Sequence, residues 1–167
     1  SKFDPSLEWS VGQMRDLKSK RKNIGDSNSE IDVVFITVGG GGLISGVSSH
    51  LKSVNPKIKV VGCSPINSAI MINSIKNGKI INTESEDTLS DGSAGGVEEG
   101  SITFDMCKEL IDEFCLISED EISLQIKNAL KYDEILVEGS AAVAIASAIK
   151  MKSFIEDKNV AIIICGG

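Results

Sequence analysis

Short apolar runs alternate with segments of helical periodicity along most of the chain. Three runs rich in valine and isoleucine, residues 32–38, 58–64 and 159–167, have the length and composition of strands buried on both faces. Residues 114–118 form a shorter run of the same kind. Segments with apolar residues three or four positions apart lie between these runs. This alternation predicts an α/β protein, a three-layer open sheet of mostly parallel strands flanked by helices.

The expected helices have recognisable ends. Asn55-Pro56 and Gly78 stop the first two, and Ser118 with Glu121 forms a capping box at the start of another. Residues 138–152 form a helix of small residues suited to close packing on a sheet. The residues expected to face the core are Leu43, Val47, Leu51 and Val54 in the first helix, Ile70, Ile72 and Ile75 in the second, and Ile102, Met106 and Leu110 in the third.

Two segments do not follow this alternation. Residues 80–100 lack a helical period and are rich in Ser, Asp, Gly and Glu, which favours a functional loop. Residues 8–22 could form a helix before a polar loop.

Composition narrows the function. The 167 residues suffice for one domain, and a net charge of −7 argues against binding to nucleic-acid phosphates. The four cysteines form no CxxC pair, and His50 is the only histidine, so a zinc site is not expected. Cys63 and Cys165 each end a strand-like run, which predicts buried, reduced thiols in a cytoplasmic protein. No apolar run approaches the ~18 residues of a membrane span.

The motif with most chemical content is VGGGGL, residues 38–43, between a predicted strand and a predicted helix. The carboxyl ends of parallel strands are where open α/β sheets bind ligands. Consecutive glycines let main-chain N–H groups line one concavity, and the helix behind adds the positive end of its dipole. The motif therefore predicts a main-chain phosphate site, the alternative being a tight turn without a ligand.

Two other phosphate motifs fit this segment less well. A Walker A loop requires Lys and Ser or Thr after its last glycine, and neither follows here at the right spacing. In the dinucleotide pattern GxGxxG, Ile44 stands where the last glycine should be. The next strand ends in Cys63-Ser64, where that pattern needs an acidic residue.

With these motifs in place, the chain resembles the fold type II pyridoxal-phosphate enzymes, in the threonine/serine dehydratase and serine racemase branch. The resemblance covers residues 3–167. It rests on VGGGGLISGV, SPINSAIM, TLSDGSAGG, LISEDEI, LVEGSAAVAIAS and IIICGG, which occur in the family's order. It implies a tryptophan synthase β-like fold, pyridoxal 5'-phosphate as cofactor, and elimination of water and ammonia from L-threonine or L-serine.

The resemblance also assigns residues. Main-chain N–H groups of Gly39, Gly40, Gly41, Gly42 and Leu43 would hold the cofactor phosphate, Cys165 would face the ring nitrogen, and Asp4 is a loose match to a family residue near the cofactor. Gly92 belongs to a loop that could wrap the substrate or ring, or be a surface turn. Glu138 is either a partner of its own helix dipole or a group behind the ring.

Two family features are missing from this chain. No lysine lies in an S-x-K-x-R-like motif, which is where the family binds the cofactor aldehyde. Residues 1–167 are therefore expected to be the carboxyl-terminal part of the large, cofactor-binding domain, without the small domain and inactive alone. Ser64 and Ile70 stand where the racemase branch has carboxylate ligands for a divalent cation, so no metal site is expected.

Three functions remain open at this point. A dehydratase is the leading interpretation, and a racemase would differ by a base in the part of the family that this sequence does not match. A phosphate-ligand binding module without catalysis is the third. By analogy with the family, the intact protein would act on a small hydroxy amino acid as a homodimer or tetramer.

Overall fold

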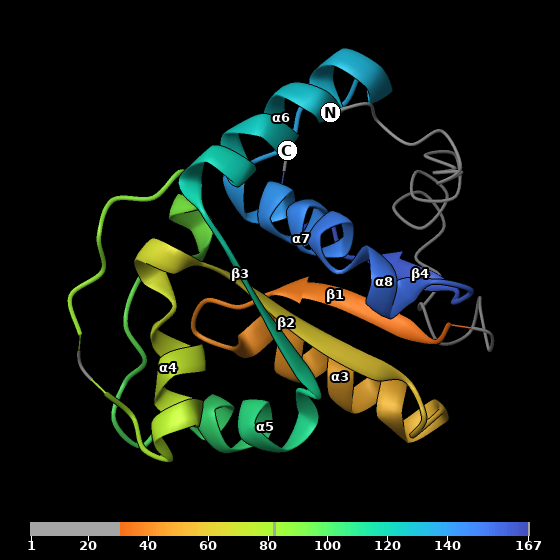
Figure 1. The fold of residues 1–167 in the computed structure, drawn as a ribbon. Helices are drawn as coiled ribbons and strands as arrows, with labels where there is room; N and C mark the ends of the chain where they lie inside the picture. Colours follow the sequence, from red (N-terminus) through yellow and green to blue (C-terminus); the bar gives the residue numbers. More distant parts are fainter. Residues whose placement is uncertain (1–30, 82, 167) are drawn as a thin grey trace.

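A four-stranded parallel sheet forms the middle layer of the computed structural model, which describes residues 31–81 and 83–166 (Figure 1). The strand order is β3-β2-β1-β4. The strands are β1 (Val33–Thr37), β2 (Lys59–Pro65), β3 (Glu113–Ile117) and β4 (Val160–Ile162). Every neighbouring pair is parallel. The α/β class and the open parallel sheet predicted from the sequence are confirmed.

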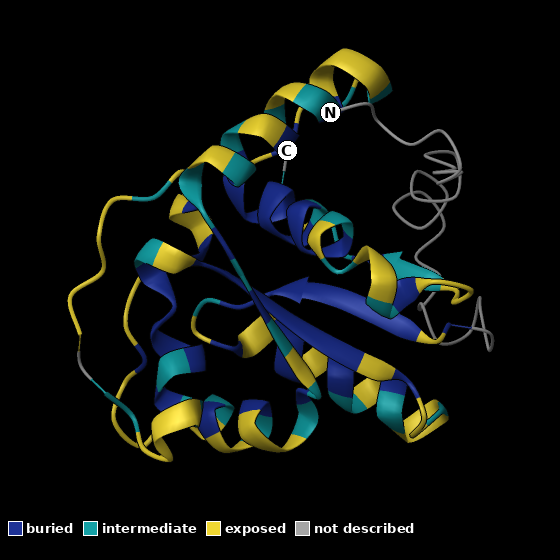
Figure 2. Cartoon of the chain, viewed as in Figure 1, coloured by how far each residue is buried: buried dark blue, intermediate teal, exposed yellow. Residues whose placement is uncertain are grey.

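Helices cover both faces of this sheet. On one face lie α3 (Gly42–Val54), α4 (Ile70–Asn77) and α5 (Ile102–Leu110); on the other lie α6 (Glu119–Asp133), α7 (Gly139–Lys150) and the short α8 (Lys152–Ile155) (Figure 1). Single 3₁₀ turns occupy Ile66–Ser68 and Asp91–Ser93. The three-layer prediction is confirmed, and Figure 2 shows β1 buried along its length.

Each face of the sheet has its own hydrophobic core. Val33 and Phe35 of β1 pack toward α7, and Val34 and Ile36 pack toward α3 and α4. This follows from the two-residue period of a strand, which sends successive side chains to opposite faces. α7 fits closely on the sheet because most of its buried residues are alanine, glycine or serine.

Several helix ends predicted from the sequence are confirmed. Ser118 and Glu121 form both hydrogen bonds of a capping box at the start of α6. Gly78 ends α4 with φ of 74°, a left-handed conformation that glycine adopts without strain. Asn55 caps the end of α3, and His50 is exposed on that helix. The helix expected at residues 8–22 lies outside the described residues.

The buried faces predicted for α3 and α5 were only partly right. In α3, Leu51 is buried and Val47 packs against the core as predicted, but Leu43 and Val54 are 46% and 50% exposed, and Ile44, Ser45 and Ser48 are buried instead. α5 buries Phe104 and Cys107 and leaves Ile102 75% exposed. The prediction counted only apolar residues, but α3 and α5 approach each other through small side chains. Ser45 and Cys107, whose Oγ and Sγ lie 3.4 Å apart, make this contact.

The final strand and its cysteine also differ from expectation. β4 spans only Val160–Ile162, shorter than the predicted 159–167, and Cys165 beyond it is exposed rather than buried. Cys63 is buried as predicted, and burial raises the pKa of its thiol to about 12 against the opposing hydrogen bond from Ser147. Because Cys165 lies past the end of the paired strand, neighbouring strands do not cover it.

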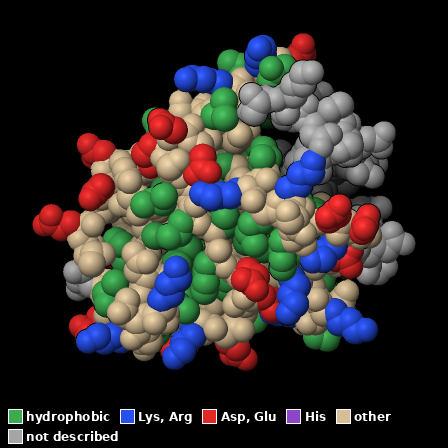
Figure 3. Space-filling model, in the orientation of Figure 1, with side chains coloured by type: hydrophobic (Ala, Val, Ile, Leu, Met, Phe, Trp, Pro, Cys, Tyr) green, Lys and Arg blue, Asp and Glu red, His purple; other side chains and the backbone are tan. Residues whose placement is uncertain are grey.

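Surface side chains are distributed unevenly. Figure 3 shows hydrophobic side chains in the middle of the face that β3 crosses, with many charged side chains around them. In β3, Phe114 and Leu116 are half-buried, and this strand pairs only with β2 within the described residues. No helix in residues 31–81 and 83–166 is long and apolar enough to cross a membrane.

Asp112 joins α3 to the start of two strands. Its carboxylate accepts hydrogen bonds from Lys52 Nζ at 2.7 Å, Lys59 Nζ at 3.1 Å and the Val60 N–H at 2.9 Å. Its own N–H donates to the Val60 carbonyl. Partial burial tends to raise the carboxyl pKa, but the hydrogen bonds from Lys52, Val60 and Lys59 outweigh it and hold the pKa below its usual value.

Asp112→Asn should lower the free energy of unfolding by about 1–2 kcal/mol at pH 7, because it removes the charge that these donors bind. The folded-state pKa lies below the unfolded one, so this stabilisation is present above about pH 4 and is lost as the pH falls further. Urea unfolding as a function of pH measures it. Asp87→Asn, at an exposed aspartate, is the control and should have little effect. A pH-independent loss in Asp112→Asn would contradict the account.

Candidate functional site

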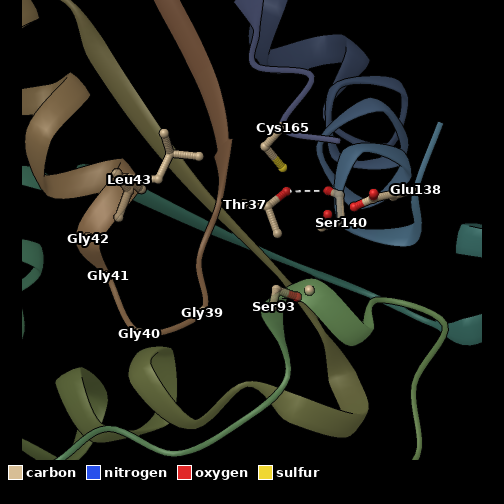
Figure 4. Close-up of a pocket in the computed structure, with 12 residues that line it drawn as sticks. Thr37, Gly39, Gly40, Gly41, Gly42, Leu43, Ser93, Glu138, Ser140 and Cys165 are labelled. Atoms are coloured by element: carbon tan, nitrogen blue, oxygen red, sulfur yellow. Dashed lines mark hydrogen bonds between the residues drawn. The ribbon is translucent and has the colours of Figure 1, made fainter. Parts of the chain in front are cut away.

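A cavity of about 290 Å³ opens at the carboxyl end of β1, where α3 begins. This is near the lower end of the range for small-molecule sites, ~300–1,000 Å³. Figure 4 shows residues from four parts of the chain around it: the end of β1 and the glycine loop, the 3₁₀ turn Asp91–Ser93, the start of α7, and the segment after β4. The lining residues are Thr37, Gly39, Gly40, Gly41, Gly42, Leu43, Ile44, Gly92, Ser93, Glu138, Ser140 and Cys165.

The glycine loop presents main-chain N–H groups that have no hydrogen-bond partner among the described residues. Ser45 is the first residue of this region whose N–H donates, to the Gly41 carbonyl. From Gly39 to Leu43, no N–H donates to the described part of the chain. The first N–H groups of a helix have no partner within it, and together with the dipole they form an anion site. The N-cap, Gly41, supplies no side-chain capping bond.

Gly41 needs to be glycine for two separate reasons. Its φ is 86°, in the left-handed region. A Cβ there would also lie 2.9 Å from both Cys107 Sγ and Met71 Cε. By contrast, a Cβ on Gly40 or Gly42 would meet nothing within 4 Å. The loop is thus tightly packed from beneath at Gly41 and open at the two adjacent glycines.

Cys107 supports the loop without adding charge to it. Its Sγ lies 3.9 Å from the Gly41 carbonyl oxygen, to which it donates, and 3.4 Å from Ser45 Oγ. Burial raises the pKa of this thiol, more than the Ser45 hydrogen bond lowers it. The thiol therefore stays protonated at neutral pH and does not oppose an anion above it.

Two glycines let the walls of the cavity approach closely. A Cβ on Gly39 would lie 3.0 Å from the Ser93 carbonyl oxygen. A Cβ on Gly139, the first residue of α7, would overlap the Leu89 carbonyl and lie 2.8 Å from the Ser90 nitrogen. The segment before the 3₁₀ turn therefore passes directly over the start of α7.

Hydrogen bonds fix this segment from several directions. The Glu119 carboxylate accepts from Thr88 Oγ1 and from the Leu89 N–H, both at 2.7 Å. Ser90 and Ser93 Oγ lie 2.6 Å apart, and both residues are buried. Thr37 Oγ1 donates to the Ser140 carbonyl at 2.6 Å, joining the end of β1 to α7 across the cavity (Figure 4).

Glu138 and Cys165 close the side of the cavity away from the glycine loop (Figure 4). The Glu138 N–H donates to the Gly166 carbonyl at 3.3 Å, which joins the start of α7 to the segment after β4. The Glu138 carboxylate lies against Gly166, since a Cβ on that glycine would overlap Oε2.

The structure thus brings together eight of the nine residues selected from the sequence. Gly39 to Gly42, Leu43, Gly92, Glu138 and Cys165 all line this cavity, and Asp4 lies outside the described residues. Ser64 and Ile70 are both buried, and Ser64 Oγ donates to the Ser68 carbonyl. The described residues contain no group of three or more His, Cys, Asp or Glu that could hold a metal ion.

Sequence reasoning missed Thr37, Ile44, Ser93 and Ser140, which also line the cavity. Ser93 lies in the quoted SDGSAGG segment, and Thr37 and Ser140 directly adjoin strand or helix ends that had been located. Their position next to the glycine motif and to Glu138 was the available signal.

The geometry defines an α/β protein with a main-chain anion site at the carboxyl edge of a parallel sheet. The chain belongs to the family described as pyridoxal-phosphate dependent enzyme, which it matches over residues 22–166. The cavity fits that cofactor for two reasons. N–H groups without a partner among the described residues suit its phosphate, and the space above Gly40 and Gly42 is open.

Known proteins of this kind resemble the chain in sequence and structure. It is 40% identical to an L-threonine ammonia-lyase from Thermotoga maritima over 83% of this chain and 34% of that protein. Among solved structures, threonine deaminase isoform 2 from Solanum lycopersicum is 38% identical, with a TM-score of 0.76 over 83% of this chain and 40% of that one. Serine racemase from Dictyostelium discoideum is 35% identical, with a TM-score of 0.74 over 83% and 44%.

These similarities confirm the predicted fold type and cofactor family. The chain spans 34% of the length of the first two curated relatives that it matches.

Gly139→Ala should destabilise the wall of the cavity. The new methyl group would force Leu89 and Ser90 away from α7, at a cost of about 1–3 kcal/mol in unfolding free energy. It should also speed cleavage by a glutamate-specific protease within residues 84–99 of the folded protein.

Gly46→Ala is the matched control, because a Cβ at this helical position meets nothing within 4 Å. It should stabilise the protein slightly, by about 0.5–1 kcal/mol, and leave the cleavage rate unchanged. Equal stability and equal cleavage for Gly139→Ala and the unmodified protein would show that the close approach is unimportant.

Proposed function

We propose that residues 1–167 are the carboxyl-terminal part of the cofactor-binding domain of a pyridoxal-phosphate-dependent threonine/serine dehydratase. The intact protein would eliminate water and ammonia from L-threonine or L-serine and give a 2-oxo acid. The observation that carries this proposal is the row of N–H groups from Gly39 to Leu43 at the start of α3, which have no partner within residues 31–81 and 83–166. The relatives named threonine ammonia-lyase and threonine deaminase supply the reaction.

In this proposal the residues of the cavity have separate tasks. Gly39 to Leu43 bind the phosphate through their main chain, and Cys165 contacts the ring. The turn containing Gly92 and Ser93 lies across from the loop and limits access of water to the substrate. Bound pyridoxal phosphate supplies the electron sink that makes the substrate Cα–H acidic.

The lysine that binds the cofactor aldehyde is assigned to a segment outside these 167 residues. None of the residues that line the cavity in the described part of the chain is a lysine. The relatives are about three times as long as the matched region, so they have ample further sequence for such a residue.

A racemase of the same family is the second candidate. The serine racemase from Dictyostelium discoideum supports it, with nearly the same identity and TM-score as the threonine deaminase. Incubation of the intact protein with L-serine separates the two, since a dehydratase forms pyruvate and a racemase forms D-serine. A cytoplasmic homodimer or tetramer remains our expectation.

Gly40→Asp should weaken binding of pyridoxal phosphate to the intact protein at least about tenfold. Its Cβ has open space, so the fold is retained, but the new carboxylate repels the phosphate. Fluorescence titration with the cofactor measures this. Gly46→Asp is the control, because it adds the same charge at an exposed, open position of α3 outside the cavity. Unchanged affinity in Gly40→Asp would refute the phosphate site.

Once circular dichroism has shown that the 167 residues alone are folded, they should bind pyridoxal phosphate without a specific bond between the cofactor aldehyde and a lysine. Borohydride reduction followed by peptide mass spectrometry should therefore find no single lysine modified stoichiometrically. Stoichiometric modification of one lysine would show that the chain contains its own cofactor lysine.

A further inference from the structure

Thr103, in the first turn of α5, contacts the glycine loop from outside the cavity. Its Oγ1 donates a hydrogen bond of 2.7 Å to the Gly40 carbonyl oxygen, and its Cβ lies 3.0 Å from the position of a Cβ on Gly41. Thr103 is half-buried and is not among the residues that line the cavity. This side chain therefore holds the loop without taking space from a ligand.

The peptide group between Gly40 and Gly41 is the one that Thr103 holds. Glycine on both sides lets this group rotate with little steric cost. The Ser45 N–H holds the next peptide group through the Gly41 carbonyl, but no main-chain N–H of the described residues donates to the Gly40 carbonyl. The orientation of this group therefore depends on the Thr103 hydroxyl.

That orientation decides what the loop presents to a ligand. A trans peptide directs its C=O and its N–H in opposite directions, and no cis peptide occurs in the described residues. The Gly40 carbonyl is held toward α5, none of whose residues line the cavity, so the Gly41 N–H points away from α5. Turned by half a rotation, the same group would present an acceptor where a phosphate needs a donor.

Ser101 in turn orients the Thr103 hydroxyl. Their Oγ atoms lie 2.8 Å apart, and because Thr103 gives its one hydroxyl proton to Gly40, Ser101 is the donor in this pair. Ser101 is the N-cap of α5, where a serine side chain usually accepts from its own helix, but it makes no capping hydrogen bond here. Its hydroxyl serves the chain of contacts to the loop instead.

We propose that Thr103 is a positioning residue of the phosphate site, which aims the Gly41 N–H at the ligand phosphate by holding the Gly40 carbonyl. The inference rests on the proposed function, and adds a side chain on α5 to a site otherwise formed by main chain. Thr103 does not touch the ligand itself. Its effect is therefore confined to ligands that carry a phosphate group.

Thr103→Val in the intact protein removes the hydroxyl and keeps the shape of the side chain. It should weaken pyridoxal phosphate about five- to tenfold, because one donor to the phosphate is lost, and leave pyridoxal, which has no phosphate, within about twofold. Fluorescence titration with each compound gives the ratio of the two affinities. Thr103→Ser keeps the hydroxyl and should retain the ratio, and Thr83→Val, at an exposed threonine outside the cavity, is the matched control.

A purely structural role for Thr103 predicts a different result. Lost packing would weaken both compounds equally or neither, and either outcome would overturn the proposal. Amide NMR gives a second readout, in which inorganic phosphate should shift the Gly41 amide proton downfield in the unmodified protein and in Thr103→Ser, and markedly less in Thr103→Val. An equal shift in all three proteins would also overturn it.

Ser101→Ala tests the same chain of contacts by a second route, which decides the matter if Thr103→Val does not fold. It should weaken pyridoxal phosphate about two- to threefold, leave pyridoxal unchanged, and add nothing to Thr103→Val in the double variant. An unchanged affinity ratio, or an independent effect in the double variant, would count against the proposal.

The same titrations separate this inference from the proposed function. If the unmodified protein binds pyridoxal phosphate no more tightly than pyridoxal, the proposed phosphate site fails. If it prefers the phosphate and Thr103→Val leaves that preference intact, only this inference fails.

Discussion

The cavity depends on main-chain segments that approach one another too closely for a side chain to lie between them. Gly39 lies against the main chain of Ser93, and Gly139 against that of Leu89, whereas Gly41 lies against the side chains of Cys107 and Met71. These contacts bring the end of β1, the turn before α5 and the start of α7 around one space. Because the polypeptide itself forms the walls, its N–H groups can face a ligand with no side chain between them.

Much of the fold could be predicted from the sequence, because β-branched runs and helix caps are local signals. The strands, the Ser118 capping box and the Gly78 stop were all recognised in this way. The buried face of α3 was predicted only in part, because it uses Ser45 and Ser48 where α5 packs closely. Such a face depends on the neighbouring helix, and an apolar period along one helix cannot reveal it.

The candidate site could likewise be predicted in part from the sequence. Gly39 to Gly42 could be found because four glycines between a strand and a helix have few explanations. Cys165 was placed at the correct edge but expected to be buried, since strand length was judged from composition while β4 ends at Ile162. Ser93 and Ser140 lie in or beside motifs that the sequence shows, but the contacts with Gly39 and Thr37 that bring them to the cavity are tertiary and leave no local pattern.

The central claim is that the main chain from Gly39 to Leu43 binds a phosphate group. Amide NMR of the intact protein during titration with pyridoxal phosphate tests it most directly. The account predicts that the amide protons of these residues shift downfield as hydrogen bonds to the phosphate form, and that inorganic phosphate shifts the same amides. Saturable binding that leaves these five amides unchanged while shifting others would contradict it.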